Sequence, residues 1–350
     1  MMKRWQAVKR LLPLMAMFAL VLSGCGREDL SVLRPQGPVA QGQLDLIKLS
    51  ISVMLVVMVV VFGIATYVLI KFRRKKGQDE KVPEQVEGNH KLEIIWTAIP
   101  LLLVLVLAIP TIQKVFAYGE NDWNNPEAVK VEVTSHQFWW EFNYPDYGVR
   151  TAQELVVPVG KKIAFQLKTN DVLHSFWVPS LGGKMDTNTE GSVNYMTLVA
   201  DKADTYIGKC AELCGPSHGF MEFRVKAVDD AAFDKWVAAF SEPAVLPADT
   251  ALAEKFKTNC LSCHAVGDQG GAMGPNLTGI GSRETIASIL LNDISGKPGT
   301  KPTKDNLVEW LMEPQAVKPG NTMPNPKDLG FSDEEIEQIA DYLANYKLDY

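Results

Sequence analysis

Two long apolar runs constrain the fold of this chain more than any other feature of its sequence. Leu49–Ile70 and Ile94–Ile112 contain no charged residue, and each is long enough to cross a bilayer as an α-helix. The basic cluster Lys71–Lys76 follows the first run directly. Because basic residues collect on the cytoplasmic side of membrane helices, the sequence predicts a two-helix transmembrane hairpin, over residues 44–118, with a cytoplasmic connection. Both ends of the mature chain would then lie outside the cytoplasm.

The first 25 residues are typical of an export signal. Four basic residues precede an apolar stretch, Leu11–Leu22, and Leu-Ser-Gly-Cys25 follows. This ending resembles a bacterial lipobox, so residues 1–24 are predicted to be a signal peptide and Cys25 to carry the lipid anchor of a palmitate-bearing lipoprotein. The alternative is an ordinary signal peptide with an incidental cysteine. A lipid anchor on the extracytoplasmic side of the membrane agrees with the topology that the basic cluster indicates.

Residues 127–228 are predicted to form an all-β Greek-key sandwich or barrel. Short runs rich in Val, Ile, Phe and Tyr are separated by Gly, Pro, Asn and Asp. The clearest of these runs are Val129–Thr134, Ile163–Lys168, Tyr195–Ala200 and Phe220–Lys226.

An all-α domain is predicted at residues 249–350, after a helix and linker at 229–248. Helical patterns occur at Ala231–Phe240 in the linker region and then at Ala251–Thr258, Arg283–Leu291, Asn306–Met312 and Ser332–Tyr346. Ser332 and Glu335 have the spacing of a capping box at the start of the last helix. The chain is therefore expected to be multidomain, with helices in the membrane and two domains outside it.

Five cysteines and the net charge limit the possible functions. A formal charge of −6 gives no general case for nucleic-acid binding. Two pairs of cysteines occur, Cys210 with Cys214 and Cys260 with Cys263, while Cys25 is alone. Disulfides are one interpretation for an exported protein. Metal binding is favoured because each pair is accompanied by His and Met at ligand spacing.

The segment Cys210–Met221 contains two thiols, an imidazole and a thioether within twelve residues, and His174 lies upstream in an Asp-x-x-His sequence. This combination of soft and borderline ligands favours copper. The set has one thiolate more than a single-copper electron-transfer site needs, which suggests two coppers bridged by two sulfurs. A structural zinc site of the Cys2His2 type is the rival interpretation, and the thioether of Met221 argues against it.

A second motif, Cys-x-x-Cys-His, occurs at Cys260, Cys263 and His264. It is the attachment signature of a c-type haem, in which the thiols bind the haem covalently and the histidine takes one axial position of the iron. A redox dithiol or half of a zinc site are the alternatives. Met273, Met312 and Met323 are candidates for the other axial position. Met323 is preferred because its Pro- and Gly-rich loop can present sulfur to the open face of the haem.

These motifs resemble one family. Residues 44–228 are similar to the binuclear copper A type of cytochrome c oxidase subunit II, and residues 249–350 to class I cytochrome c. The resemblance is to the bacterial form in which the two are fused, and it implies a cupredoxin-like fold for the β-domain. It implies the following copper ligands: Cys210 and Cys214 as bridges, His174 and His218 on one copper each, and Met221 and the Glu212 backbone carbonyl as weak ligands. The Glu212 carboxylate would face a magnesium ion shared with subunit I, for which a loop acid in solvent is the alternative.

Two further positions follow from the resemblance. The family usually has Gln-Trp-Tyr-Trp where this chain has Gln137-Phe-Trp-Trp140, and its first Trp receives the electron from soluble cytochrome c. Phe138 at that position predicts that the donor is the tethered haem and that Trp139 or Trp140 accepts the electron; the alternative is that both pack in the core. Glu93 matches the family position near the mouth of a proton channel in subunit I, although an interfacial acid is the alternative.

The sequence therefore predicts a membrane-anchored electron relay: haem to copper to subunit I, where oxygen would be reduced and protons pumped. The expected partners are oxidase subunits I and III, membrane lipid, and cytochrome c or a quinol–cytochrome c reductase as donor. One alternative is the electron-entry subunit of another respiratory reductase, such as one acting on nitric oxide. Another is a copper-delivery or thiol-redox protein.

Overall fold

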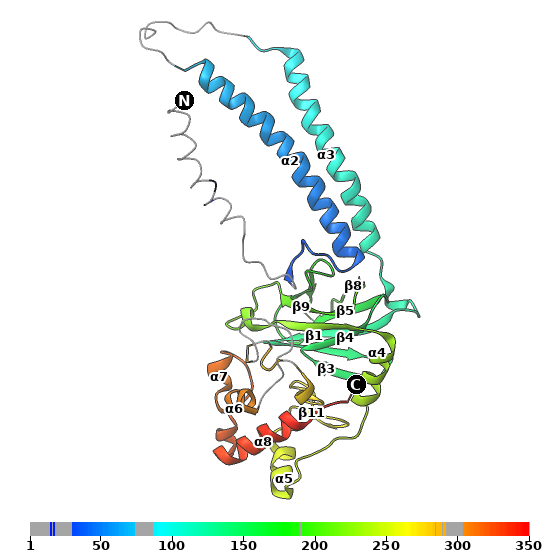
Figure 1. Ribbon diagram of the computed structural model, residues 1–350, viewed down its shortest axis with the longest axis vertical. Coiled ribbons are helices and arrows are strands. Elements are labelled where there is room, and N and C mark those ends of the chain that lie inside the picture. The colour runs from blue at the N-terminus through cyan, green and yellow to red at the C-terminus, as the bar shows by residue number, and fades with distance from the viewer. Residues whose placement is uncertain are drawn as a thin grey trace.

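The computed structural model describes residues 15, 17, 30–73, 87–189, 191–283, 285–288, 290–291 and 304–349. Three parts follow one another along the long axis of the molecule: a helical hairpin, a β-sandwich and a helical domain (Figure 1). The predicted multidomain architecture is confirmed. Cys25, the proposed lipidation site, and most of the basic cluster lie outside the described residues.

The hairpin consists of α2 (Pro38–Lys71) and α3 (His90–Tyr118). Both helices contain the predicted spans and extend beyond them. They are long and apolar enough to cross a membrane, and the apolar window of each is entirely unburied. The Asn89 side chain accepts hydrogen bonds from the amides of Lys91 and Leu92 and so caps α3.

The base of the hairpin rests directly on the β-sandwich. The Gln36 amide donates to the Ser180 carbonyl at 2.7 Å, and the Ala40 amide donates to the Leu181 carbonyl at 3.1 Å. Gly42 allows the two helices to approach, because a Cβ at this position would collide with the Tyr118 hydroxyl. These contacts fix the sandwich close to the end of the apolar helices.

The sandwich has two five-stranded sheets, ordered β3-β2-β1-β5-β8 and β4-β10-β9-β6-β7. The strands are β1 (Val129–His136), β2 (Trp139–Tyr144), β3 (Val149–Ala152), β4 (Glu154–Pro158), β5 (Ile163–Thr169), β6 (His174–Trp177), β7 (Met185–Thr187), β8 (Asn194–Leu198), β9 (Asp204–Cys210) and β10 (Phe223–Val228). Their buried aromatic side chains, including Trp140, Phe142, Phe176 and Phe223, form one core. The predicted strands differ from these by a few residues at their ends.

Helix α4 (Asp230–Phe240) belongs structurally to the sandwich. Its Phe233, Trp236 and Phe240 join the sandwich core, so the linker proper begins after this helix. The Asp229 carboxylate accepts a hydrogen bond of 2.8 Å from the Ala232 amide and caps the helix.

The C-terminal domain is helical around a separate core. It contains α5 (Thr250–Asn259), α6 (Lys304–Met312), the short α7 (Pro314–Val317) and α8 (Asp333–Asn345), with a small ladder of β11 (Ala265–Val266) and β12 (Gln269–Gly270). The predicted capping box is present: Ser332 Oγ accepts from the Glu335 amide and the Glu335 carboxylate accepts from the Ser332 amide.

The predicted helix at Arg283–Leu291 is wrong for the residues that are described there. They form turns, and Ala287 and Ser288 have positive φ angles of 49° and 71°. The physical reason is tertiary: the Ser288 hydroxyl accepts hydrogen bonds from Gln153 of the sandwich and from Lys318, which outweigh the local helical preference of an apolar sequence.

Candidate metal centres and the interface between them

The sandwich brings the predicted copper ligands together from two neighbouring strands and one loop. His174 begins β6 and Cys210 ends β9, and these strands are paired with Phe176 opposite Cys210. The other candidates lie in the loop between β9 and β10. Strand pairing therefore places an imidazole from one chain segment against a thiol-bearing loop from another.

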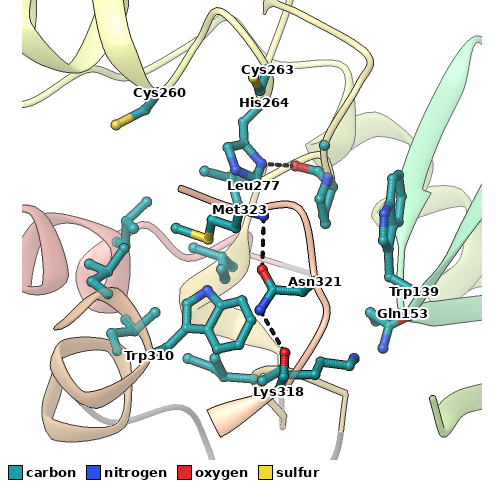
Figure 2. Close-up of a pocket in the computed structure, with 18 of the residues that line it drawn as sticks. Trp139, Gln153, Cys260, Cys263, His264, Leu277, Trp310, Lys318, Asn321 and Met323 are labelled. Carbon is teal, nitrogen blue, oxygen red and sulfur yellow. Dashed lines mark hydrogen bonds between the residues drawn. The ribbon is translucent and has the colours of Figure 1, made fainter. Parts of the chain in front are cut away.

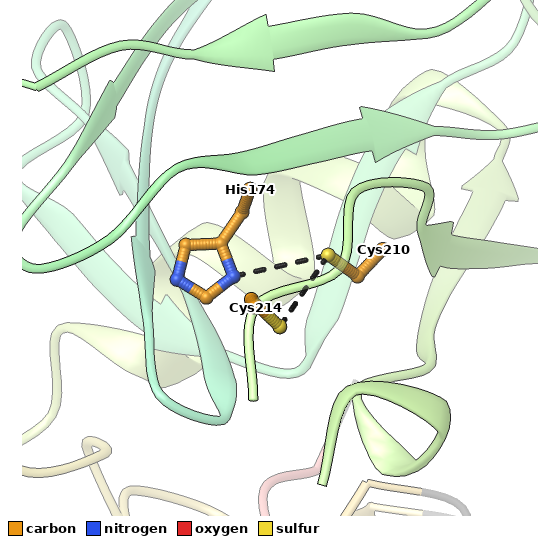
Figure 3. A group of neighbouring side chains, drawn as sticks. All are labelled: His174, Cys210 and Cys214. Carbon is orange, nitrogen blue, oxygen red and sulfur yellow. Dashed lines mark hydrogen bonds between the residues drawn. The ribbon is translucent and has the colours of Figure 1, made fainter. Parts of the chain in front are cut away.

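The central cluster consists of His174, Cys210 and Cys214, whose ligand atoms all lie within 4.8 Å of one another. The two sulfurs are 3.9 Å apart and His174 Nδ1 is 3.8 Å from Cys210 Sγ. Figure 3 shows the imidazole and both thiols pointing toward a common point. All three residues are buried.

The remaining predicted ligands surround this cluster. His218 Nδ1 and Met221 Sδ lie 3.5 Å and 3.9 Å from Cys214 Sγ, while the Glu212 carbonyl oxygen lies 3.2 Å from Cys210 Sγ. Each sulfur thus has one imidazole and one weak ligand beside it. This symmetric donor set of two thiolates, two imidazoles, one thioether and one carbonyl fits a pair of soft metal ions bridged by sulfur.

Asp171 fixes the orientation of His174. Its Oδ1 lies 2.8 Å from His174 Nε2, which leaves Nδ1 directed at the thiols. Its Oδ2 accepts a hydrogen bond of 2.6 Å from the Gln137 amide. Burial disfavours the charged imidazole, but Asp171 and Cys210 more than offset this and raise the pKa of His174. Such a carboxylate–imidazole pair is a common support for metal-bound histidine.

The two thiols share one proton favourably. The hydrogen bond from Cys214 lowers the pKa of Cys210, and the same contact raises the pKa of Cys214. A single thiolate is therefore stabilised before any cation binds, and a metal ion would displace the second proton.

The C-terminal domain borders a largely apolar cavity of about 350 Å³, and Gln137, Phe138, Trp139 and Gln153 of the sandwich form part of its wall. Cys260, Cys263, His264 and Met323 all line it (Figure 2). The two thiols are not joined as a disulfide. Two thiols and an imidazole at an apolar cavity are the donor set that a covalently bound haem requires, so the residues fit the group that the motif predicts.

A hydrogen bond fixes the orientation of the His264 imidazole. Its Nδ1 donates a hydrogen bond of 2.7 Å to the Pro275 carbonyl, which leaves Nε2 unprotonated and available to iron. Burial lowers the pKa of His264, so the ring is neutral. Gly274 permits this placement, since a Cβ there would lie 2.8 Å from His264 Cε1.

Among the three candidate methionines, Met323 is the one that both lines the cavity and packs against the domain core. It is partly buried against the core, whereas Met273, which also lines the cavity, is 71% exposed. Met312 lies on α6 and packs against the core. Asn321 shapes the Met323 loop by accepting from the Met323 amide and donating to the Lys318 carbonyl, both contacts being visible in Figure 2.

The two candidate metal sites meet across a polar interface. Three segments of the C-terminal domain near the haem cavity are hydrogen-bonded to the sandwich. The contacts run from Arg150 Nη2 to the Gly271 carbonyl (3.0 Å), from Asn276 Nδ2 to the Arg150 carbonyl (2.8 Å), from Ser217 Oγ to the Pro319 carbonyl (2.7 Å), from Gln153 Nε2 to Ser288 Oγ (2.6 Å) and from Lys318 Nζ to the Phe138 carbonyl (2.5 Å).

Three matches with protein families follow the same division of the chain. Residues 31–113 match the transmembrane domain of cytochrome c oxidase subunit II, residues 148–228 match its periplasmic domain, and residues 253–347 match cytochrome c. Cytochrome c oxidase subunit 2 of Alkalihalophilus pseudofirmus is 44% identical over 357 residues, covering 99% of each chain. The chain belongs to the cytochrome c oxidase subunit 2 family. It is thus an oxidoreductase subunit with copper and haem domains, and it takes part in electron transfer within an oxidase that also contains subunit I.

Other relatives extend the comparison. Cytochrome c oxidase subunit 2 of Bacillus sp. strain PS3 is 44% identical, covering 97% of this chain and 98% of the relative. Quinol oxidase subunit 2 of Bacillus subtilis is 38% identical over 241 residues, covering 67% of this chain and 73% of the relative. The crystal structure of the periplasmic domain of subunit II of cytochrome oxidase from Bradyrhizobium japonicum has 32% identity and a TM-score of 0.31, covering 32% of this chain and 94% of that chain.

The aromatic run of this family member divides between the cavity and the core. Trp139 lines the haem cavity and stacks on the ring of His136 at a centroid distance of 4.0 Å. Trp140 is fully buried, and its Nε1 donates to the Met221 carbonyl at 3.0 Å. Phe138 is also buried, between Gly215 of the copper loop and Gly320 of the Met323 loop. Thus the expectation that both tryptophans could merely fill the core describes Trp140 but not Trp139.

Glu93 lies in the first turn of α3, half-exposed, with a carboxylate oxygen 3.7 Å from His90 Nδ1. Asp171 was part of the Asp-x-x-His sequence that identified His174, but the sequence suggested no role for it. Ser217 and Lys318 were not predicted to matter. No local sequence feature distinguishes Ser217 or Lys318, because both make their contacts only where the two domains meet.

Proposed function

We propose that this subunit relays electrons from a covalent haem, held by Cys260, Cys263 and His264, to a binuclear copper centre held by Cys210 and Cys214. From there the electrons would pass to a haem in subunit I, where oxygen is reduced to water and protons are pumped. The observation that carries this proposal is the contact between the two sites: Gln137, Phe138 and Trp139 line the haem cavity, and Gln137 Nε2 donates a hydrogen bond of 2.5 Å to the Cys214 carbonyl of the copper loop.

The arrangement supports electron transfer rather than catalysis at the copper site. Four further donor groups lie beside the two thiols, so the complete set of six would leave no coordination position for a substrate. Cys210 and Cys214 would share charge between two ions, and the rigid sandwich would limit rearrangement. His174, His218, Met221 and the Glu212 carbonyl complete the proposed set, with Met323 as the second axial ligand of the haem.

The tethered haem is proposed to be the immediate electron donor. Phe138, at the position of the family's electron-accepting Trp, is covered by the Met323 loop, so a soluble cytochrome has no access to it. Trp139 is proposed as the entry residue and Trp140 as a buried connection to Met221. Tethering keeps the donor at an effective concentration up to about millimolar, and the interdomain hydrogen bonds hold it docked.

The remaining roles follow from the family. The Glu212 carboxylate would share a magnesium ion with subunit I, Glu93 would lie near the mouth of its proton channel, and Cys25 would carry the lipid anchor. The two metal domains would face the extracytoplasmic side, and the hairpin would pack against subunits I and III. A soluble cytochrome c or a quinol–cytochrome c reductase would reduce the haem.

Metal analysis of the purified protein tests the relay. We expect two coppers and one haem iron per chain. Cys214→Ser should abolish the near-infrared copper absorption and leave the haem spectrum intact, while Cys263→Ser should weaken haem attachment and leave copper unchanged. A single zinc, or a Cys210–Cys214 disulfide formed in place of copper binding, would contradict the proposal and favour a zinc or copper-delivery role.

A reductase of nitric oxide is the second candidate, because the acceptor chemistry lies in another subunit. Consumption of oxygen and of nitric oxide by the purified complex, with reduced cytochrome c as donor, separates the two. Oxygen consumption with little nitric oxide turnover is the expected result.

A further inference from the structure

Lys318 is a buried cation at the boundary between the haem cavity and the copper domain. Its side chain is 4% exposed and lines the cavity. Nζ donates to the Phe138 carbonyl at 2.5 Å and to Ser288 Oγ at 2.8 Å. Among the described residues no carboxylate forms an ion pair with it. A buried ammonium without an opposite charge is costly, so this environment lacks an anion.

The groups around Lys318 have more hydrogen-bond donors than acceptors. An ammonium has three N–H groups, and two of them have acceptors among the described residues. Ser288 Oγ accepts from both Lys318 Nζ and Gln153 Nε2, so its own O–H remains to be donated. Ser288 is 2% exposed and lines the same cavity. Among the described residues, one N–H and one O–H therefore have no acceptor at the cavity wall, as in a site for a carboxylate.

The cavity itself indicates which carboxylate is missing. It is otherwise largely apolar and is bordered by the thiols and imidazole that fit a covalent haem, and a haem has two propionate groups. Figure 2 shows the Lys318 side chain running along the wall toward Gln153, at the opposite end of the cavity from Cys260 and Cys263. The thiol-bearing edge of the haem and its propionate edge lie on opposite sides of the ring, which agrees with this placement.

We propose that Lys318 and Ser288 bind one propionate of the haem and thereby join the haem to the Phe138 carbonyl of the copper domain. The inference rests on the proposed haem in the cavity. Lys318 is a positioning residue: one ammonium contacts the haem carboxylate and the strand that carries Trp139. It fixes the distance between donor and acceptor and favours the reduced haem, because a nearby cation disfavours the additional positive charge of ferric iron.

Burial supports the need for this anion. It lowers the pKa of Lys318 to about 7, and the Cys214 thiol opposes the change only in part. Without an anion the side chain would be only partly charged near neutral pH, whereas a propionate would keep it protonated.

Redox titration of the haem in the full-length, detergent-solubilised protein tests the inference. Lys318→Met keeps the length of the side chain and removes its charge. We expect one haem per chain and a redox equilibrium displaced about tenfold toward the oxidised form, the size expected for a unit charge near a buried redox centre; tenfold is 59 mV for one electron. Lys318→Arg should restore the native equilibrium. Lys327→Met, which removes an exposed cation of the same domain that is paired with Asp333, is the matched control and should titrate as the native protein does.

Ser288→Ala provides a second route if Lys318→Met does not accumulate. Loss of the hydroxyl should displace the same equilibrium in the same direction, by about threefold, the size of one modest hydrogen bond. The inference would be overturned if haem-loaded Lys318→Met had the same redox equilibrium as the native protein. If that variant does not accumulate, the same result for Ser288→Ala would overturn it. Either result would leave the relay intact. A native protein without haem on Cys260 and Cys263 would instead overturn the relay, and the inference with it.

Discussion

Ser217 Oγ donates a hydrogen bond of 2.7 Å to the Pro319 carbonyl, which joins the loop of copper ligands to the loop that carries Met323. Ser217 lies immediately before His218, and Pro319 lies four residues before Met323. The Ser217 side chain is fully buried. The two proposed electron-transfer sites are therefore connected through one side chain, and the geometry of one loop constrains the other.

Ser217→Ala should loosen this connection without removing a ligand. Loss of one neutral hydrogen bond weakens docking by about 1 kcal/mol, or about fivefold in the docking equilibrium. We expect slower haem-to-copper electron transfer in flash-photolysis measurements, with unchanged copper and haem contents. Ser241→Ala removes a hydroxyl that donates to Val237 within α4 and serves as the control. Equal transfer rates in both variants would show that the Ser217 contact does not set the docking.

Asp171→Asn should weaken copper binding and leave the haem unaffected. The carboxylate holds the tautomer of His174 that directs Nδ1 to the thiols, and loss of such a support costs about 10–100-fold in metal affinity. Copper affinity is measured by competition with a chelator. Asp204→Asn, a change at an exposed acid at the start of β9 that bonds only the adjacent Thr205 amide among the described contacts, should bind copper normally. An unchanged affinity for Asp171→Asn would contradict the orienting role.

The sequence could predict both ligand sets because each is concentrated in a short segment. Cys210, Cys214, His218 and Met221 occupy one loop, and their spacing survives any arrangement of the surrounding strands. His174 is distant from this loop in the sequence, but its Asp-x-x-His sequence identified it as a candidate ligand. The fold class was predictable for the same reason, since apolar length and alternation are local properties.

The interface was not predictable, because it depends on which face of the helical domain meets the sandwich. Lys318 occurs in an unremarkable Val-Lys-Pro-Gly sequence, and its burial results from Phe138, 180 residues earlier. The missed turn at Ser288 has the same cause: local spacing favours a helix there, whereas contacts with Gln153 and Lys318 determine the observed backbone.

Gly274→Ala should disturb the haem ligand without touching the thiols. The new Cβ would lie 2.8 Å from His264 Cε1 and 2.9 Å from Nδ1, so either the imidazole or its hydrogen bond to Pro275 must move. We expect covalent haem with a partly high-spin spectrum. Gly63→Ala in α2, where a Cβ meets nothing within 4 Å, is the control. A native haem spectrum in Gly274→Ala would mean that the loop yields instead of the imidazole.

Acid should destabilise the last helix, because it protonates the Glu335 carboxylate. Lys255 and the Ser332 amide stabilise its carboxylate and lower its pKa to about 2 from an ordinary value of 4.5. Because the pKa is lower in the folded state, the stabilisation is fully present above pH 4.5 and is lost as the pH falls toward 2. Unfolding of the helical domain in urea, followed by circular dichroism across this range, should therefore show a pH dependence that Glu335→Gln reduces. Glu334→Gln, at an adjacent acid for which the described residues show no ion pair, should retain the dependence.

Replacing Met323 and Met273 in turn should identify the second axial ligand of the haem iron. Met323→Ala should abolish the methionine–iron absorption, because Met323 is held in the cavity by a loop that Asn321 shapes. The reduction potential of the haem should fall as well, since methionine ligation raises it. Met273→Ala should leave both properties unchanged, because that side chain is largely exposed. If Met273→Ala removes the absorption while Met323→Ala retains it, the axial ligand lies in the loop that follows His264, and the Asn321-shaped loop has only a docking role.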